Sequence, residues 1–427
     1  MDKLKITGPC RLDGEVAAAG AKNAALPALA ASLLTDKKVT LSRVPSVRDL
    51  RTMRKLLEHL GVECSGSERT LELCHATPLE SDDAPYELVK TMRASVLVLG
   101  PLLARLGHAR VSLPGGCAIG SRPIDQHLAG LEALGAQVTL EHGYVTARTQ
   151  PEGSGTPGRL RATRFRFATP TVGGTENLVM AATLARGTTV LENCAQEPEI
   201  RDLIELLTKM GARISGGGGA TIEIEGVDAL GGASHSILTD RIEAGTYLIA
   251  AAITGGRVTV RDAVAADLAP LLELLSECGC EVEASPDAVT VARGARLSPR
   301  NMVTTPHPGF PTDLQAQYLT LMTQAAGTST ICETIFENRF QHVPELRRMG
   351  ANIEIHGNVA RVIGPTRLTG ARVMATDLRA SACLVLAALA ADGESVVDRI
   401  YHLDRGYETM ELKLHRLGAE RCVERTT

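Results

Sequence analysis

A cysteine in a glycine-rich segment has the surroundings that most clearly suggest chemistry. Cys117 follows Gly115 and Gly116, and Arg122 comes five residues later. A nearby cation favours the thiolate form of a cysteine, and glycines allow a loop to move over a site. The segment therefore fits a reactive thiol. The alternative is a glycine-rich turn that contains a small residue by chance.

Charged or polar residues also stand at the start of six apolar segments. They are Lys22-Asn23, Arg93, Thr175-Glu176, Asp240-Arg241, Asp313 and Arg379. Such residues can be helix caps and nothing more. Lysine and arginine, however, oppose the helix dipole at an N-terminus, where backbone N–H groups bind anions. We therefore expect an anionic ligand near these helix starts.

Further polar residues follow the strands that come after these segments. They are Glu197-Pro198-Glu199, Asn338-Arg339 and Asp404-Arg405. Asp125 could bind a ligand or cap the helix that begins there. His127 and His402 have no partner at metal-ligand spacing, so we interpret both as structural hydrogen-bonding residues and expect no metal site.

The elements that position these residues are repeated six times. A residue pair ending in glycine closes a leucine-rich segment and opens an alternating one at Leu60-Gly61, Leu134-Gly135, Met210-Gly211, Cys278-Gly279, Met349-Gly350 and Leu417-Gly418. The glycines are 68 to 76 residues apart, which is too long for a solenoid repeat and suits one small α/β unit. Equivalent loops of several units can then converge on one cleft.

Each unit is predicted to contain an apolar helix, a β-branched strand, a loop, a second leucine-rich helix and a further strand. The first helices are predicted over 24–34, 94–106, 177–185, 245–253, 314–326 and 382–391. The strands after them are predicted over 39–44, 110–113, 189–192, 257–261, 329–333 and 395–399. Because these helices are apolar nearly all round, we expect them to lie inside a shell of sheets.

Two domains of three units each are expected, since 427 residues exceed what one hydrophobic core usually serves. Residues 22–232 would form the N-terminal domain. Residues 1–21 would join 233–427 in a discontinuous C-terminal domain, because the opening segment has no partner near the first helix and could pair with the last unit. Gly216 to Gly219 lacks the lysine of a phosphate-binding loop and is interpreted as a hairpin turn.

The composition indicates a soluble cytoplasmic protein. A net charge of −4, a pI near 6.3 and only 3% aromatic residues argue against a nucleic-acid binder. The ten cysteines show no CxxC or paired metal-ligand spacing, as is typical of reduced cytosolic cysteine. No apolar run approaches the roughly 18 residues of a membrane span, and the N-terminus is not that of a signal peptide.

Six motifs together carry a family resemblance. They are Gly-Ala-Lys-Asn-Ala-Ala at 20–25, Lys-Thr-Met-Arg-Ala-Ser at 90–95, Pro-Gly-Gly-Cys at 114–117, Phe-Pro-Thr-Asp at 310–313, Phe-Glu-Asn-Arg-Phe at 336–340 and Asp-Arg-Gly-Tyr-Glu at 404–408. With these motifs the whole chain closely resembles the UDP-N-acetylglucosamine enolpyruvyl transferases. The resemblance implies an α/β fold of two inside-out α/β barrels, built from six βαβαββ-type repeats with three in each domain.

The resemblance also implies a reaction. The enolpyruvyl group of phosphoenolpyruvate would pass to the 3-hydroxyl of UDP-N-acetylglucosamine with release of phosphate, in the first committed step of bacterial peptidoglycan synthesis. The partners would be these two small molecules, with no nucleic acid and no membrane, and no cofactor is expected. Such a reaction needs an acid at the methylene carbon and a base near the sugar hydroxyl, and Asp313 is the candidate base. The sequence assigns no oligomeric state.

Matching positions carry the implied roles of the site residues. The phosphate of phosphoenolpyruvate would be held by Lys22, Arg122 and Arg405. Cys117 would be the general acid and the residue alkylated by fosfomycin. The substrate pocket would include Asn23 and Arg93, and the nucleotide sugar would contact Arg122, Pro123, Ile124, Asp125, Gln126, Pro170, Thr171, Val172, Gly173, Asp313 and Ile335. Supporting groups would be Glu197, Arg339, Asp377 and Arg379.

Two positions depart from the pattern of the family. Thr169 stands where many members have lysine, which would weaken one contact to the diphosphate, and Thr171 replaces a serine but keeps the hydroxyl. Two alternative functions are an enzyme like enolpyruvylshikimate phosphate synthase and a non-catalytic nucleotide-sugar sensor. The cysteine loop and Arg122-Pro123 argue against the first, and the joint presence of Cys117, Asp313 and Arg405 argues against the second.

Overall fold

The six glycines that mark the repeats all take one backbone conformation. In the computed structural model, φ lies between 91° and 102° at Gly61, Gly135, Gly211, Gly279, Gly350 and Gly418. This region is open to glycine and strained for other residues. At the first five, the residue after the glycine donates its N–H to the carbonyl five positions earlier, as Val62 does to Leu57. This Schellman motif ends the second helix of a repeat and turns the chain into the next strand.

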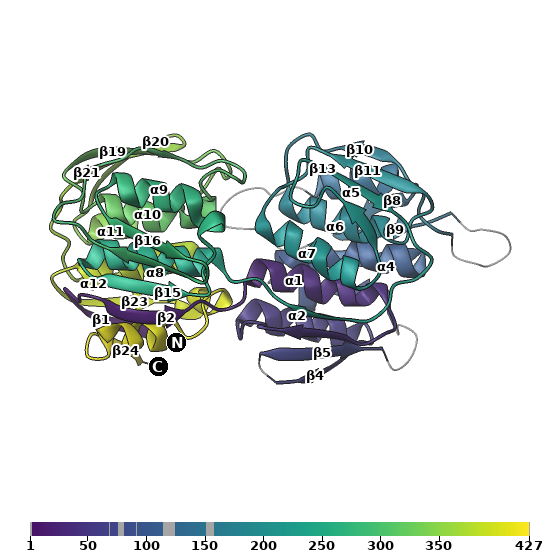
Figure 1. The fold of residues 1–427 in the computed structure, drawn as a ribbon, viewed down its shortest axis with the longest axis horizontal. Helices are drawn as coiled ribbons and strands as arrows, with labels where there is room; N and C mark the ends of the chain where they lie inside the picture. Colours follow the sequence, from purple (N-terminus) through teal and green to yellow (C-terminus); the bar gives the residue numbers. More distant parts are fainter. Residues whose placement is uncertain are drawn as a thin grey trace. The chain divides into compact units, whose positions relative to one another are not determined.

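The structure describes residues 2–67, 69–75, 81–90, 92–113, 124–150 and 158–426. They fall into two compact units (Figure 1): the first comprises 2–19 and 239–426, the second 20–113 and 124–238. The sequence prediction ended the N-terminal domain at residue 232. Residues 233–238 belong with it, because β14 (Ala233–Ser236) pairs in parallel with β3 (Val39–Ser42).

The described residues of each unit form three four-stranded sheets of one topology. A central strand pairs in parallel with an edge strand and antiparallel with a third strand, which pairs antiparallel with the fourth. The sheets of the second unit are β14-β3-β5 (Thr70–Cys74)-β4 (Glu63–Gly66), β6 (Asp83–Ala84)-β7 (His108–Ser112)-β9 (Tyr144–Arg148)-β8 (Gln137–Glu141) and β10 (Arg164–Arg166)-β11 (Thr188–Glu192)-β13 (Thr221–Glu225)-β12 (Arg213–Ser215). Those of the first unit are β2 (Asp13–Ala17)-β15 (Arg257–Arg261)-β17 (Ala288–Ala292)-β16 (Glu281–Ser285), β18 (Met302–Val303)-β19 (Gly327–Cys332)-β21 (Val359–Gly364)-β20 (Asn352–His356) and β22 (Arg372–Met374)-β23 (Gly393–Asp398)-β1 (Lys3–Gly8)-β24 (Val423–Thr426).

Two edge strands are exchanged along the chain. β2 directly precedes the first helix of the second unit, yet it pairs with β15 in the first unit. β14 precedes the helix that begins at Arg241 in the first unit, yet it pairs with β3 in the second unit. The opening strand β1 pairs with β23 and β24 of the last repeat, which confirms that part of the prediction. The strand that follows it joins the fourth repeat instead.

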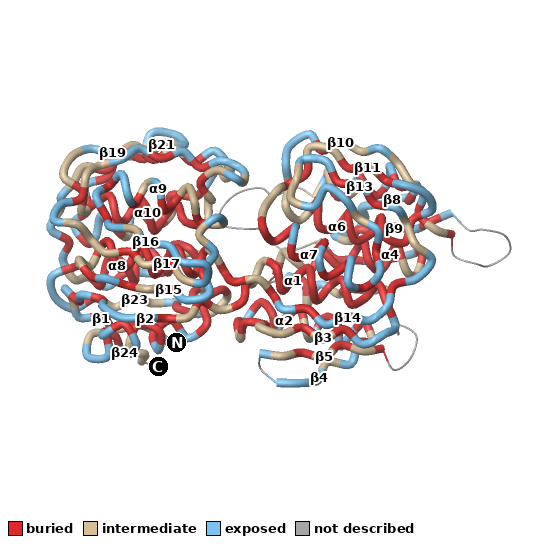
Figure 2. Tube along the Cα trace, viewed as in Figure 1, coloured by how far each residue is buried: buried red, intermediate tan, exposed pale blue. Residues whose placement is uncertain are grey.

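The first helix of every repeat is buried, as its composition predicts. These helices are α1 (Lys22–Ala31), α4 (Leu99–Leu106) after η2 (Arg93–Val98), α6 (Val172–Ala182), α8 (Arg241–Thr254), α10 (Gln315–Met322) after η4 (Thr312–Leu314), and α12 (Leu378–Ala390). Figure 2 shows α8 and α10 as buried segments within their unit. Small residues allow close packing; a Cβ at Gly100 would lie 2.3 Å from the Asn177 amide oxygen. Each unit has its own apolar core.

The second helices lie at the ends of the loops that follow the central strands. They are α2 (Arg48–His59), α5 (Asp125–Ala133), α7 (Pro198–Lys209), α9 (Ala269–Glu277), α11 (Val343–Arg348) and α13 (Met410–Leu414). Shorter helices are η1 (Ser32–Leu34), α3 (Tyr86–Val89), η3 (Ala265–Leu268), η5 (Ile400–Arg405) and η6 (His415–Ala419). Residues 216–220 connect the antiparallel strands β12 and β13, so the predicted hairpin is confirmed.

Three first helices begin four or five residues earlier than predicted. α6, α8 and α12 start at Val172, Arg241 and Leu378, because side-chain caps precede them. The capping residues Thr171, Asp240 and Asp377 accept backbone N–H groups of the first turn, which satisfies donors that have no partner within the helix. Thr175 and Glu176 consequently lie inside α6, not before it.

Candidate active site

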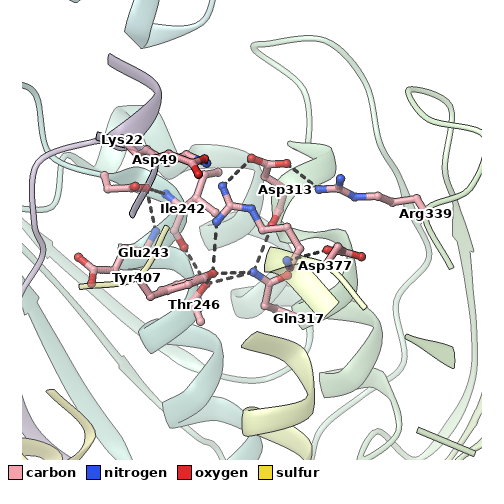
Figure 3. Close-up of polar contacts among 12 residues, drawn as sticks. Lys22, Asp49, Ile242, Glu243, Thr246, Asp313, Gln317, Arg339, Asp377 and Tyr407 are labelled. Carbon is pink, nitrogen blue, oxygen red and sulfur yellow. Dashed lines mark hydrogen bonds and ion pairs between the residues drawn. The ribbon is translucent and has the colours of Figure 1, made fainter. Parts of the chain in front are cut away.

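The carboxylate of Asp313 is held between two buried arginines (Figure 3). Its Oδ1 accepts a hydrogen bond of 2.6 Å from Arg339 Nη2, and its Oδ2 accepts one of 2.6 Å from Arg379 Nη2. The side chains of Arg339 and Arg379 are 4% and 6% exposed, whereas that of Asp313 is 26% exposed. Hydrogen bonds between ions are about twice as strong as neutral ones. The two arginines therefore fix a charged carboxylate that solvent still reaches.

Residues from two successive repeats form this cluster. Asp313 lies in η4 at the start of the buried helix α10, and Arg339 lies in the loop between β19 and α11. Arg379 is the second residue of α12, where Asp377 caps the helix by accepting the N–H groups of Arg379 and Ala380 at 2.8 and 3.0 Å. The cap offsets the cost of placing a cation at a helix N-terminus.

Electrostatics keep Arg379 charged although it is buried. Burial lowers the pKa of its guanidinium, but Asp313, Tyr407 and Asp240 outweigh that effect and raise the pKa overall. His342, which precedes α11, is fully buried beside Arg339, and burial lowers its pKa to about 4. Two guanidinium groups therefore contact the Asp313 carboxylate, and a neutral imidazole lies beside one of them, Arg339.

A layer of uncharged polar groups supports Arg379 and Asp313 (Figure 3). Gln317 Nε2 donates to the backbone carbonyl of Asp313 at 3.1 Å and lies 3.1 Å from both Tyr407 Oη and Thr246 Oγ1. The Tyr407 and Thr246 hydroxyls are 2.8 Å apart, and Arg379 Nη1 lies 3.5 Å from the tyrosine oxygen. All three side chains are buried.

Buried Glu333 ties the loop that carries Ile335 to the start of η4. Its Oε1 accepts the backbone N–H groups of Ile335 and Phe336 at 2.8 and 3.1 Å. Its Oε2 accepts the hydroxyl of Thr312, the neighbour of Asp313, at 2.8 Å. Ile335 is half-buried. One carboxylate thus fixes the relative position of two segments that the sequence assigned to the nucleotide-sugar pocket.

In the second unit, Lys22 is paired with a carboxylate that the sequence analysis did not identify. Lys22 is the first residue of α1, and its Nζ lies 3.2 Å from Asp49 Oδ2 on α2. Their side chains are 12% and 7% exposed. Asn23 and Arg93, at the starts of α1 and η2, are half-buried. Because the ammonium group faces a carboxylate, the helix start tolerates a cation against its dipole.

A second carboxyl group of this unit is more deeply buried. Glu176 on α6 is 3% exposed, and its Oε1 has no hydrogen-bond partner within the described chain. Burial raises its pKa well above the usual range, and the charges of Glu199 and Glu197 at the start of α7 raise it further. The surroundings of Glu176 therefore favour its protonated form.

His127 is a structural residue, as predicted. It is buried, and its Nδ1 lies 3.1 Å from the side-chain amide nitrogen of Asn177. Burial lowers its pKa to about 4, with a further contribution from Arg93. Asp125 is the first residue of α5, whose capping position is Ile124. The capping interpretation of Asp125 is therefore wrong, and its carboxylate is exposed.

Four of the residues predicted to contact the nucleotide sugar follow one another at the start of α6. Pro170 is exposed, and Thr171, Val172 and Gly173 are half-buried at the start of α6. Gln126 binds Thr169, the residue before Pro170. Its Oε1 accepts the N–H of Thr169 at 3.3 Å, and its Nε2 donates to the Thr169 hydroxyl at 3.1 Å. The hydroxyl of Thr169 is thus engaged within the chain.

Three predicted site residues, Cys117, Arg122 and Pro123, lie outside the described residues. Arg405 ends η5 and is half-buried. Within each unit, the structure brings together Asp313, Arg339 and Arg379 in the first and Lys22 with the unpredicted Asp49 in the second. The signals for the missed residues were weak: Gln317 stands one helical turn after Asp313, and Tyr407 stands two residues after Arg405.

The described residues show neither a metal-binding cluster nor a membrane-spanning helix. No group of three or more His, Cys, Asp or Glu side chains there is arranged to hold a metal ion. Nor does that part of the chain contain a helix with the length and apolar character needed to cross a membrane. The nine described cysteines are all free.

Comparisons with known proteins establish the family. Residues 6–414 match the family model described as EPSP synthase (3-phosphoshikimate 1-carboxyvinyltransferase). The chain is 54% identical over 418 residues to the UDP-N-acetylglucosamine 1-carboxyvinyltransferase of Psychrobacter sp. (strain PRwf-1), which covers 98% of this chain and 95% of that protein.

Solved structures confirm the predicted fold. The crystal structure of the enolpyruvyl transferase NikO from Streptomyces tendae matches with a TM-score of 0.87 and 26% identity, over 100% of this chain and 99% of that one. EPSP synthase from Acinetobacter baumannii has the same fold, with a TM-score of 0.75 and 17% identity over the whole of both chains. The chain belongs to the EPSP synthase family of enolpyruvyl (carboxyvinyl) transferases.

Proposed function

We propose that this protein transfers the enolpyruvyl group of phosphoenolpyruvate to the 3-hydroxyl of UDP-N-acetylglucosamine and releases phosphate. The choice of acceptor is supported by the 54% identity to a UDP-N-acetylglucosamine 1-carboxyvinyltransferase over nearly the whole chain. The chemistry is supported by one feature above all, the carboxylate of Asp313 held charged and partly exposed between Arg339 and Arg379. A fixed, ionised carboxylate is suited to act as a general base.

The proposed reaction has two stages. The methylene carbon of phosphoenolpyruvate gains a proton from Cys117, while Asp313 removes the proton of the sugar hydroxyl and the sugar oxygen bonds to the adjacent carbon. The C–O bond to phosphate then breaks, and the phosphate leaves with the bonding electron pair and the proton that Asp313 removed. The Cys117 thiolate takes a proton from the new methyl group, which restores the double bond and the thiol. The products are the enolpyruvyl ether and inorganic phosphate, with no net change in oxidation state.

The remaining roles follow the family pattern. Lys22, Arg122 and Arg405 hold the phosphate of phosphoenolpyruvate, each ionic hydrogen bond contributing on the order of 1.5 to 3 kcal/mol. Asn23 and Arg93 complete that pocket. The nucleotide sugar is bound by Arg122 to Gln126, Pro170 to Gly173, Asp313 and Ile335. Arg339, Asp377 and Arg379 support Asp313, an assignment consistent with their contacts, and Glu197 is a further supporting group.

The test is release of phosphate from phosphoenolpyruvate in the presence of UDP-N-acetylglucosamine, with 3-phosphoshikimate as a parallel acceptor. We expect release with the nucleotide sugar alone. Release with 3-phosphoshikimate alone would assign the protein to the other branch of the family. Release with neither acceptor would contradict the proposal and favour a non-catalytic sensor.

The proposal extends to the cellular role and to inhibition. The product supplies peptidoglycan synthesis in the bacterial cytoplasm, so loss of the protein should disturb cell shape and division. Fosfomycin should alkylate Cys117, and faster when the nucleotide sugar is present. Peptide mapping of the labelled protein checks this, and labelling spread over several cysteines would contradict a special reactivity of Cys117.

A further inference from the structure

Tyr407 belongs to the Asp-Arg-Gly-Tyr-Glu motif, yet the proposed reaction gives it no role. Its side chain is 1% exposed, so it binds no substrate directly from solvent. Its hydroxyl lies among Thr246, Gln317 and Arg379, on the side of Arg379 away from the Asp313 contact, since the Nη1 nitrogen faces Tyr407 and the Nη2 nitrogen faces Asp313. The two ends of one guanidinium group thus join the tyrosine to the carboxylate.

The direction of each hydrogen bond in this group can be deduced. Thr246 Oγ1 donates its only hydrogen to the carbonyl of Ile242 at 2.7 Å, one turn earlier on α8. The Thr246 oxygen must therefore accept the hydrogen of Tyr407, which lies 2.8 Å away. The lone pairs of the tyrosine oxygen are left for Gln317 Nε2 at 3.1 Å and Arg379 Nη1 at 3.5 Å. Burial raises the pKa of Tyr407, so the hydroxyl keeps its proton.

We propose that Tyr407 is a positioning residue for the transferase reaction, which orients the Arg379 guanidinium and thereby keeps Asp313 ionised and aligned as the base. The inference rests on the proposed function, because it takes the role of Asp313 from there. The chain of bonds runs from the backbone of α8 through Thr246, Tyr407 and Arg379 to Asp313. Each member is buried except the last, which faces the site.

Other charged and titratable groups also act on this chain. Asp240, at the start of α8, raises the pKa of both Arg379 and Tyr407. Arg339 contacts the second oxygen of Asp313, and neutral His342 lies beside Arg339. These groups are unchanged when only the tyrosine hydroxyl is removed. The ring of Tyr407 is also retained, 5.7 Å from the Arg379 guanidinium carbon, so any cation–π attraction persists.

A matched pair of variants separates positioning from a general effect of losing a buried hydroxyl. Tyr407→Phe removes the hydroxyl that contacts Arg379. Tyr247→Phe removes the hydroxyl of an equally buried tyrosine in the same unit, one that has no hydrogen-bond partner within the described chain. We expect Tyr407→Phe to lower kcat about tenfold with KM for both substrates nearly unchanged, and Tyr247→Phe to leave both constants at the wild-type value.

The pH profile distinguishes the mechanism. Without the tyrosine oxygen, Arg379 is less firmly oriented toward Asp313, so the charged form of the carboxylate is less stabilised and its pKa rises. The acidic limb of kcat/KM should move to higher pH in Tyr407→Phe and stay in place in Tyr247→Phe. An unmoved limb, or equal effects of the two substitutions, would overturn the proposal.

A second measurement does not depend on turnover. In protein labelled with carbon-13 at the aspartate carboxyl groups, the Asp313 signal is identified by its loss in Asp313→Asn. Its midpoint of titration should rise in Tyr407→Phe, and an unchanged midpoint refutes the inference even if the enzyme acts on another acceptor. Should Tyr407→Phe fail to fold, Thr246→Val removes the acceptor of the same hydroxyl and should shift the midpoint in the same direction.

Discussion

Asp313 and Asp377 occupy corresponding places in successive repeats of one unit, yet their carboxylates do different things. Asp377 caps α12, accepting the N–H groups of Arg379 and Ala380, and Asp240 caps α8 in the same way in the repeat before. Asp313 stands at the start of η4 and α10, which have no side-chain cap. Its oxygens accept hydrogen bonds from Arg339 and Arg379 instead.

This difference separates a capping aspartate from one that caps no helix, without reference to any relative. A capping aspartate typically contributes about 1 kcal/mol to the stability of its helix. In the fifth repeat, the Asp313 carboxylate does not stabilise α10 in this way. It is bound by the buried Arg339 and Arg379, and its own side chain is partly exposed to solvent. Proteins tend to break local stability rules at functional sites. The departure at Asp313 is recognisable because Asp240 and Asp377 cap the corresponding helices of the neighbouring repeats.

In the second unit, the charged residue at the start of a first helix is a cation. Lys22 stands at the first position of α1, after Ala21, which makes no side-chain cap. The cation is balanced by Asp49 from α2. In the first unit an acid is held by bases, and in the second a base is held by an acid.

The largest expected effect comes from neutralising Asp313. Asp313→Asn keeps the shape of the side chain but removes its capacity to accept a proton, and general-base catalysis typically contributes 10²- to 10⁴-fold. We therefore expect phosphate release to fall by about 10³-fold. Steady-state assays of phosphate release check this.

Asp240→Asn is the control for this substitution. Asparagine is as good a cap as aspartate, so this variant should retain activity within about threefold. Comparable losses in Asp240→Asn and Asp313→Asn would remove the distinction between the two places in the repeat.

Lys22→Met tests the cation of the second unit. Loss of an ionic contact to phosphate should lower kcat/KM for phosphoenolpyruvate about 100-fold. Because the largely buried Asp49 loses its contact with the Lys22 ammonium group, the free energy of unfolding should also fall by about 1 to 3 kcal/mol. Assays at varied phosphoenolpyruvate and urea unfolding measure the two effects.

Lys38→Met provides a matched comparison within that unit. The Lys38 ammonium also lies 3.2 Å from a carboxylate, that of Glu72, but the two side chains are 57% and 42% exposed. Exposed ion pairs contribute little to stability. We expect activity and stability near the wild-type values, and a loss as large as that of Lys22→Met would show that the assay reports net charge alone.

Much of the fold could be predicted from local sequence. The six glycines were recognised from their spacing, and their positive φ explains why no other residue suits those turns. The first helices were recognised because they are apolar on all faces. The domain of residues 1–21 was predicted, but the sheets that β2 and β14 join were not, because both are parallel edge strands and their alternation fits either sheet.

The site was predictable only in part, for a related reason. Motifs identified Asp313, Arg339 and Arg379, but their mutual contacts join residues 26 and 66 positions apart, which local patterns do not encode. Asp49 lies on the amphipathic helix α2, where an acidic residue in the first turn is ordinary. The remaining residues, Gln317, Thr246 and Tyr407, lie in buried segments, so the sequence favours interpreting them as core residues.

A smaller effect is expected from the structural aspartates. Asp240→Ala removes the oxygen that accepts the N–H groups of Ile242 and Glu243 at 2.8 and 3.0 Å. The free energy of unfolding should fall by about 1 kcal/mol. Urea unfolding measures it, beside Asp240→Asn, which should be neutral. An equal loss in both variants would indicate that charge, not capping, is the contribution of Asp240.

A last effect concerns the buried carboxyl of the second unit and depends on pH. Asp313 is charged because two arginines compensate it, whereas burial, reinforced by Glu199 and Glu197, raises the pKa of Glu176 well above its usual range. Below the unfolded-state pKa both states are protonated and the group has no effect. As pH rises above it, the unfolded chain loses the proton first, so folding becomes less favourable.

Glu176→Gln removes this dependence and should be more stable than wild type at pH 8 but equal to it near pH 4. Urea unfolding at the two pH values tests the sign, and a variant that is less stable at pH 8 would show that Glu176 is ionised and compensated, like Asp313.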